Sequence, residues 1–155
     1  MPVFNCTLLM LHFLIFVFSL QVGTDSSHCQ DITVPLCQNL PYNQTVMPNL
    51  MGNQNQQDAE HDIHTYKYHM LVKLDCSKDI QIFICAMFTP VCTIIKKALP
   101  PCRELCESAK SGCEEVLEQF SVPWPAQFDC AQFPRAGQGG NNLCVGQANR
   151  GSFSR

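Results

Sequence analysis

The sequence predicts a small, mainly α-helical, disulfide-rich single domain with about three to four helices, short β segments and five disulfides. Of eleven cysteines in 155 residues, ten lie between Cys29 and Cys144, and the eleventh, Cys6, falls in an apolar leader. An even cysteine count after a secretory leader is typical of a disulfide framework rather than of reactive thiols. Apolar residues also recur at helical spacing in three segments between these cysteines.

Residues 1–24 are predicted to be a signal peptide. They contain no Lys, Arg, Asp or Glu, and residues 8–22 are an almost unbroken apolar run. About 15 residues is typical of a signal peptide, whereas a membrane-spanning helix needs about 20. Small residues from Gly23 to Ser27 favour cleavage there. We therefore expect an extracellular chain, secreted as written, or held at the cell surface if membrane spans follow in the full-length protein.

Little regular structure is predicted before the first helix. Residues 31–36 fit either a short strand or an extended lead-in to Pro35. Residues 40–52 are rich in Pro, Asn and Gly, which is typical of a loop. Asn43 begins the sequon Asn-Gln-Thr in this loop and is a candidate glycosylation site.

Residues 53–74 are predicted to form the first helix. Apolar side chains recur there at steps of four, three and four residues: Ala59, Ile63, Tyr66 and Met70. This spacing places them on one face of an amphipathic helix. We interpret Ile63 and Tyr66 as core positions, whereas Met70 fits the core and a ligand contact equally well.

Residues 79–88 are predicted to form the second helix. Ser77 can cap its start, and Pro90 ends it because proline cannot continue a helix. The residues that share its apolar face are Ile80, Phe83, Ile84 and Met87.

The third predicted helix, residues 102–119, has the clearest pattern. Pro100 and Pro101 open it, since proline is tolerated in a first turn. At about 100° per residue, Cys102, Cys106 and Cys113 project within about 40° of one another. Cβ atoms four residues apart on a helix are separated by about 5–6 Å, but a disulfide needs about 3.8 Å. The three sulfurs must therefore reach other segments, which makes this helix the hub of the domain.

After the hub helix the pattern becomes irregular. Pro123 and Pro125 flank Trp124, which we interpret as a structural anchor rather than a contact residue. Residues 136–142, AGQGGNN, are predicted to be a flexible loop. Residues 148–155 are predicted to be a flexible tail or linker.

Several function classes are disfavoured. The net charge of −3 is spread without long runs, so no nucleic-acid patch is indicated. His61, His64 and His69 have no evident further ligand, and we interpret them as solvated side chains rather than a metal site. No nucleophile signature of an enzyme is visible. The expectation is a protein that is not an enzyme and needs no cofactor or metal.

The cysteine spacing and several motifs resemble the cysteine-rich domain of the Frizzled receptors. The similarity extends over residues 29–147. The motifs that carry it are YNQT at 42–45, PNLMG at 48–52, FICAMFTPVC at 83–92, LPPCRELCE at 99–107, Gly112-Cys113, Trp124-Pro125, Phe133-Pro134 and LCVGQ at 143–147. The resemblance implies the pairs Cys29–Cys92, Cys37–Cys85, Cys76–Cys113, Cys102–Cys144 and Cys106–Cys130.

The resemblance also implies a binding function. Domains of this family bind Wnt proteins and hold the fatty acyl chain of the Wnt in an apolar groove. Carried over by position, the groove residues are Tyr68, Met70, Leu71, Leu117, Phe120 and Val122. A second apolar patch for a finger-like Wnt loop would involve Met87, Phe88, Val91 and Val145. Met70 stands where the family has a proline, and Ser121 and Val122 stand where it has a glycine and an aromatic residue.

Two other functions stay open beside a Wnt-binding receptor domain or soluble decoy. One is a related module that binds a free sterol or fatty acid. The other is a structural extracellular disulfide module without a lipid site. A homodimer through the domain also stays open.

Overall fold

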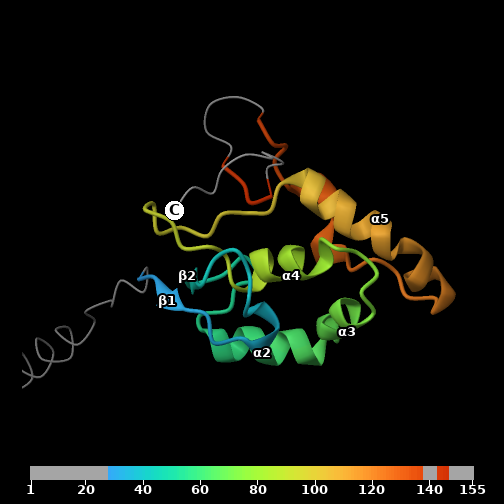
Figure 1. The fold of residues 1–155 in the computed structure, drawn as a ribbon, viewed down its shortest axis with the longest axis horizontal. Helices are drawn as coiled ribbons and strands as arrows, with labels where there is room; N and C mark the ends of the chain where they lie inside the picture. Colours follow the sequence, from blue (N-terminus) through green and yellow to red (C-terminus); the bar gives the residue numbers. More distant parts are fainter. Residues whose placement is uncertain (1–27, 138–142, 147–155) are drawn as a thin grey trace, which may run out of the picture.

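A computed structural model describes residues 28–137 and 143–146 of the chain (Figure 1). Within these ranges it has four α-helices: α2 (Gln56–Thr65), α3 (Tyr68–Lys73), α4 (Ile80–Phe88) and α5 (Arg103–Gln119). One small sheet pairs β1 (Gln30–Asp31) with β2 (Gln44–Thr45), and three short 3-10 turns cover Pro35–Cys37, Ala126–Phe128 and Cys130–Gln132. The mainly α-helical, disulfide-rich fold predicted from the sequence is confirmed.

Some predicted segments lie outside the described residues. They are the signal peptide at 1–24, the tail at 148–155 and residues 138–142 of the glycine-rich loop. In the part of the chain that the structure describes, no helix has the length and apolar character required to span a bilayer.

The two β strands close the N-terminal end of the domain. They pair antiparallel, with Gln30 opposite Thr45 and Asp31 opposite Gln44. An isolated bridge then joins Thr45 to Val91, just after α4. Strand β1 thus begins one residue before the segment predicted as strand or lead-in and overlaps it only at Asp31, and its partner β2 lies inside the segment predicted as loop.

The first predicted helix is broken into two. Lys67 adopts a left-handed backbone conformation, with φ of 58°, and separates α2 from α3. The break changes which side of the chain faces the core. Tyr66 is 61% exposed and Met70 is 44% exposed, whereas Tyr68 and Leu71 are buried. The prediction of Tyr66 as a core residue is therefore wrong.

Helix α4 lies at the centre of the domain. It packs against α2, α3, α5 and the 3-10 turn Pro35–Cys37, and Figure 1 shows it between α5 on one side and α2 and α3 on the other. Ser77 accepts a hydrogen bond from the Asp79 amide at 3.2 Å before the helix starts, and Pro90 follows its end. Because neighbours surround it, α4 is buried on nearly all of its faces.

Five disulfides join Cys29–Cys92, Cys37–Cys85, Cys76–Cys113, Cys102–Cys144 and Cys106–Cys130. These are the pairs that the resemblance implies. Three of them start from α5 or from its N-cap residue and reach three different segments. Helix α5 is therefore the hub that its cysteine spacing predicts.

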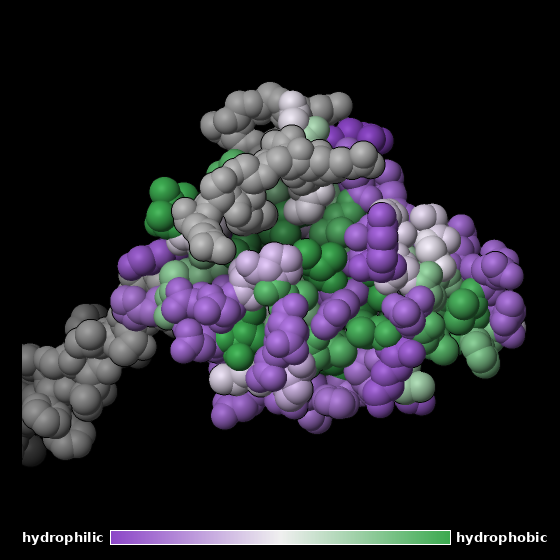
Figure 2. Space-filling view, viewed as in Figure 1, coloured by the Kyte–Doolittle hydropathy of each residue, from purple (hydrophilic) through white to green (hydrophobic). Residues whose placement is uncertain are grey.

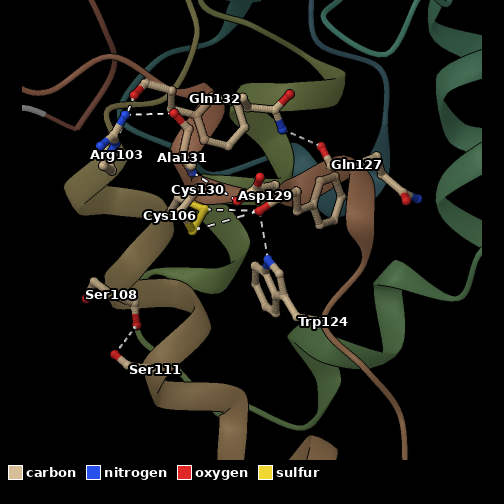
Figure 3. The surroundings of a disulfide bond; sticks show 12 residues. Arg103, Cys106, Ser108, Ser111, Trp124, Gln127, Asp129, Cys130, Ala131 and Gln132 are labelled. Carbon is tan, nitrogen blue, oxygen red and sulfur yellow. Dashed lines mark hydrogen bonds between the residues drawn. A yellow bond between two sulfur atoms is a disulfide. The ribbon is translucent and has the colours of Figure 1, made fainter.

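An aromatic cluster fills the space between α4 and the segment after α5. The Phe83 ring lies 5.3 Å from the ring of Phe128 and 5.9 Å from those of Trp124 and Phe133. The Trp124 indole donates a hydrogen bond to the Phe128 carbonyl at 2.8 Å, beside the Cys106–Cys130 disulfide (Figure 3). Buried indole N–H groups usually require such a partner. These contacts give Trp124 an anchoring role.

Tyr42 ties the loop before β2 to the end of α4. Its hydroxyl donates to the Thr89 carbonyl at 3.0 Å, and Thr45 donates to the Pro90 carbonyl at 2.8 Å. Burial raises the pKa of Tyr42 to about 12, against a smaller lowering by the hydrogen bond. The phenol therefore stays neutral and keeps its proton for this hydrogen bond at physiological pH.

Changing Gly112 to Ala in α5 is expected to destabilise the fold. A Cβ atom on Gly112 would lie 2.6 Å from the Ser77 Cβ and 3.0 Å from the Cys76 carbonyl oxygen. Alanine is favoured over glycine by about 1 kcal/mol inside a helix, but overpacking costs about 1–3 kcal/mol. The displaced atoms here include backbone next to the Cys76–Cys113 bond, so we expect a net loss of about 1–2 kcal/mol in denaturant unfolding.

The matched control is Ser111→Ala, one residue earlier in the same helix. Ser111 is exposed, and its hydroxyl donates a hydrogen bond to the Ser108 carbonyl within its own helix. Its change should move the unfolding free energy by less than about 0.5 kcal/mol. An increase in stability for Gly112→Ala would contradict the close approach of α5 to residues 76–77.

Candidate functional site

An apolar groove of about 260 Å³ lies between α3 and the C-terminal part of α5. All of its lining residues except Lys67 are apolar or aromatic. They are Tyr66, Lys67, Tyr68, Met70, Leu71, Leu74, Val116, Leu117, Phe120, Val122, Pro123 and Pro125. Figure 2 shows hydrophobic side chains reaching the surface toward the C-terminal end of α5.

One wall of the groove depends on the left-handed turn at Lys67. This turn starts α3 in a new direction, so Tyr68 and Leu71 enter the core while Met70 remains 44% exposed. The Tyr68 ring lies 4.8 Å from Phe128 and 5.7 Å from Phe88. Helix α3 is thereby fixed on the core, and Met70 remains available to line the groove.

The other wall depends on how α5 ends. Ser121 has a positive φ of 52°. Its amide donates to the Glu118 carbonyl at 3.0 Å, and the Val122 amide donates to the Leu117 carbonyl at 2.9 Å. These two bonds form a Schellman motif, which reverses the chain after a helix. The reversal brings Val122 and the prolines that follow it back against the groove.

The groove has a buried floor and an exposed rim. Tyr68, Leu71 and Leu117 are buried at the floor. The rim residues are all more than 40% exposed: Tyr66, Met70, Leu74, Phe120 and Val122. Contiguous exposed apolar side chains of this kind mark binding surfaces, because water contact with them is unfavourable. The arrangement suits an extended apolar ligand.

A polar contact orients the floor residue Tyr68. Its hydroxyl contacts the Gln127 side-chain amide, and its ring stacks on Tyr66 with ring centroids 5.8 Å apart. Burial raises the pKa of Tyr68. The hydroxyl therefore stays neutral and adds no charge to the apolar groove.

The structure brings together all six residues expected in the groove, Tyr68, Met70, Leu71, Leu117, Phe120 and Val122. The sequence reasoning missed six other lining residues. Leu74 could have been found because it follows Leu71 and Met70 by three and four residues on the same helix. Lys67 and Val116 carry no local signal for a groove, and neither do the prolines at 123 and 125.

Of the four residues expected in the second patch, Met87 and Phe88 are buried, whereas Val91 and Val145 are half-buried. Met87 and Phe88 are only 4% and 0% exposed, because α4 is covered by its neighbours. The backbone of Val91 forms an isolated β-bridge with Thr45, and the backbone of Val145 forms another with Pro101. Met87 and Phe88 therefore offer almost no exposed surface in this structure, and the second patch stays a prediction.

The histidines that the structure describes form no three-ligand cluster. The rings of His64 and His69 lie 4.6 Å apart at the corner between α2 and α3. Within residues 28–137 and 143–146, no group of three or more His, Cys, Asp or Glu side chains could hold a metal ion.

The geometry defines a class of protein: a cysteine-rich module in which five disulfides hold helices around an open apolar groove. The chain belongs to the Fz domain family, whose model matches residues 29–137. The resemblance to Frizzled cysteine-rich domains is therefore confirmed.

The chain is 46% identical over 123 residues to Frizzled-1 of Xenopus laevis. This match covers 79% of the chain but 21% of Frizzled-1, so the chain spans about a fifth of the length of that relative.

Two solved structures of the Smoothened cysteine-rich domain are similar. The selenomethionine-labelled domain is 25% identical with a TM-score of 0.49, covering 72% of this chain and 96% of that one. The Xenopus domain in complex with cyclopamine is 21% identical with a TM-score of 0.48, covering 66% of this chain and 89% of that one.

Proposed function

We propose that this chain is an extracellular Wnt-binding domain that holds the acyl chain of a lipid-modified Wnt in the groove between α3 and α5. The observation that carries the proposal is the lining of that groove, in which Lys67 is the one charged residue among twelve. A hydrocarbon chain gains affinity from such a lining without any charge complementarity.

The groove can supply most of the affinity by burial alone. Each CH₂ group removed from water contributes about 0.8 kcal/mol, so eight of them contribute about 6 kcal/mol before ordering costs. The floor residue Tyr68 is already held in place by Phe88, Phe128 and Gln127. A prearranged floor lowers the entropy cost of binding, which leaves more of the burial energy as affinity.

The proposal places the domain outside the cell. Five disulfides require an oxidising compartment, and the signal peptide proposed at residues 1–24 would deliver the chain there. Asn43 is exposed beside β2 and is a proposed glycan site. Free in solution, the domain would sequester Wnt; attached to membrane spans, it would bring Wnt to the cell surface.

The test compares an acylated Wnt with an acyl-deficient form of the same Wnt on the immobilised chain. We expect the acylated form to bind at least about thirty-fold more tightly, because about 2 kcal/mol is a modest fraction of the burial energy of the chain. Equal binding of the two forms would refute the groove mechanism. A stoichiometric sterol in a lipid extract of the purified chain would instead favour a free-sterol module.

A further inference from the structure

The methionines of the described chain differ sharply in their access to water. Met70 is 44% exposed, whereas Met47 and Met87 are only 1% and 4% exposed. Met51 is half-buried and packs against the core. The two further methionines of the sequence lie before residue 28, outside the described part of the chain. Among the described residues, an oxidant in the surrounding water therefore reaches the Met70 thioether most readily.

The cysteines that the structure describes do not compete for such an oxidant. All ten of them are joined in the five disulfides. None therefore presents the thiolate that reacts with oxidants in reduced proteins. In the oxidising compartment that these disulfides require, the exposed thioether becomes the sulfur open to chemical change.

Met70 is held firmly at the groove. It lies in the first turn of α3, where its amide donates a hydrogen bond to the Lys67 carbonyl at 2.9 Å and its carbonyl accepts one from the Leu74 amide at 2.9 Å. Its side chain lines the same groove as Phe120 and Val122, which follow from the end of α5. A change in polarity at this sulfur therefore changes the ligand-facing lining of the groove.

Oxidation by a peroxide makes this side chain polar. Hydrogen peroxide transfers one oxygen atom to the Met70 sulfur. A sulfur lone pair forms the new S–O bond, the O–O bond breaks, and the remaining oxygen leaves as water. The sulfur is oxidised by two electrons and the peroxide is reduced by two. The product, methionine sulfoxide, is polar and is returned to methionine by methionine sulfoxide reductases.

We propose that Met70 is a redox modification site, at which a peroxide lowers the affinity of the groove for its apolar ligand. An acyl chain that covers the sulfoxide has no hydrogen-bond donor, so the S–O group loses its water without a replacement. Because Met70 is exposed, its oxidation removes no buried core contact and leaves the domain folded. The inference rests on the proposed function, since it concerns regulation of the same groove.

The test treats the disulfide-bonded chain with hydrogen peroxide, removes the peroxide with catalase, and then measures binding of acylated Wnt. Peptide mass spectrometry should show sulfoxide forming at Met70 at least about tenfold faster than at Met47 or Met87, because burial excludes the oxidant. The oxidised chain should bind acylated Wnt about tenfold more weakly, as expected for one polar group buried without a partner. Its midpoint of denaturant unfolding should not change.

Protection by the ligand gives a second measurement. If the acyl chain covers Met70, acylated Wnt bound before the peroxide is added should slow sulfoxide formation there. The acyl-deficient form should not slow it. Equal protection by both forms would contradict contact between the acyl chain and Met70.

Two leucine variants are the matched controls. Met70→Leu keeps an apolar side chain of similar volume without the sulfur. Peroxide should therefore not alter its dissociation constant for acylated Wnt, whatever the starting value. Met51→Leu changes a methionine that does not line the groove and should respond to peroxide as the unchanged chain does.

Two results would overturn the inference alone. One is an equal loss of binding in Met70→Leu and the unchanged chain after peroxide. The other is a chain oxidised at Met70 that binds acylated Wnt as tightly as before, while still preferring it to the acyl-deficient form. Equal binding of the two Wnt forms before any oxidation would instead overturn the proposed function, and this inference with it.

Discussion

Changing Phe120 to Asp should weaken binding of an acylated Wnt by at least about thirty-fold while leaving the fold intact. Phe120 is 66% exposed on the groove rim, so its side chain contributes little to the folded domain but is available to a ligand. Losing the contact of one large apolar side chain costs about 1.5–3 kcal/mol. A carboxylate in its place must also lose water when an acyl chain covers it, which adds to the loss.

The measurement is the dissociation constant for the acylated Wnt, together with the unfolding free energy in denaturant. The matched control is Ile94→Asp, which introduces the same charge at an exposed apolar residue outside the groove. It should leave the dissociation constant unchanged. If Phe120→Asp binds acylated Wnt as tightly as the unchanged chain, the rim does not contact the ligand.

Met70 offers an independent check on the same groove. It lies on α3, on the wall opposite Phe120, and is also exposed. If one acyl chain fills the groove, Met70→Asp and Phe120→Asp should both weaken binding of the acylated form. Neither should affect the residual binding of the acyl-deficient form.

The second large effect is expected for Phe83→Ala, which should destabilise the fold by about 4 kcal/mol. Phe83 is fully buried in α4 and packs against the rings of Trp124, Phe128 and Phe133. Truncating a buried phenylalanine costs about 3–5 kcal/mol, because apolar contact is lost and a cavity remains. The measurement is denaturant unfolding with all disulfides intact, since reduction would change the unfolded state.

Phe120→Ala is the control for this prediction, since it makes the same chemical change on the surface. Its unfolding free energy should change by less than about 0.5 kcal/mol. A similar small change for Phe83→Ala would mean that the aromatic cluster does not support the domain. Trp124 lies between Pro123 and Pro125 of the groove wall, so disruption of the cluster should also weaken ligand binding where the variant stays folded.

Local patterns predict helices α4 and α5 well. Helix α5 begins within one residue of the predicted start and ends at the predicted residue. Its cysteines project to one side because the helical repeat is a local property, so their spacing already requires partners outside the helix. The six groove residues came from the family resemblance instead, and no periodicity in the sequence assigned them to one site.

Two differences in burial between expectation and structure share a physical cause. The predicted apolar face from Ala59 to Met70 requires one continuous helix. In the structure the backbone of Lys67 is left-handed and ends that continuity, and no Gly or Pro at this position indicates the break in the sequence. Met87 and Phe88 were assigned to a second patch by the family resemblance, and both are buried in the structure because neighbouring elements cover α4 on nearly all of its faces. Burial depends on where the neighbouring elements pack, which is not a local property.

The sequence by itself determined the disulfide-based class of this domain, the hub role of α5 and the apolar character of the segments around it. The number of cysteines is enough to predict a disulfide framework, because disulfide formation is covalent chemistry between residues of one type. Helical periodicity is enough to predict the hub role of α5 and the apolar faces, because it is a property of a single element. Only the tertiary structure decided that α3 turns away from α2, that Gly112 must stay small against residues 76–77, and which apolar side chains line the groove. These features arise from contacts between distant segments, whose geometry no short stretch of sequence contains.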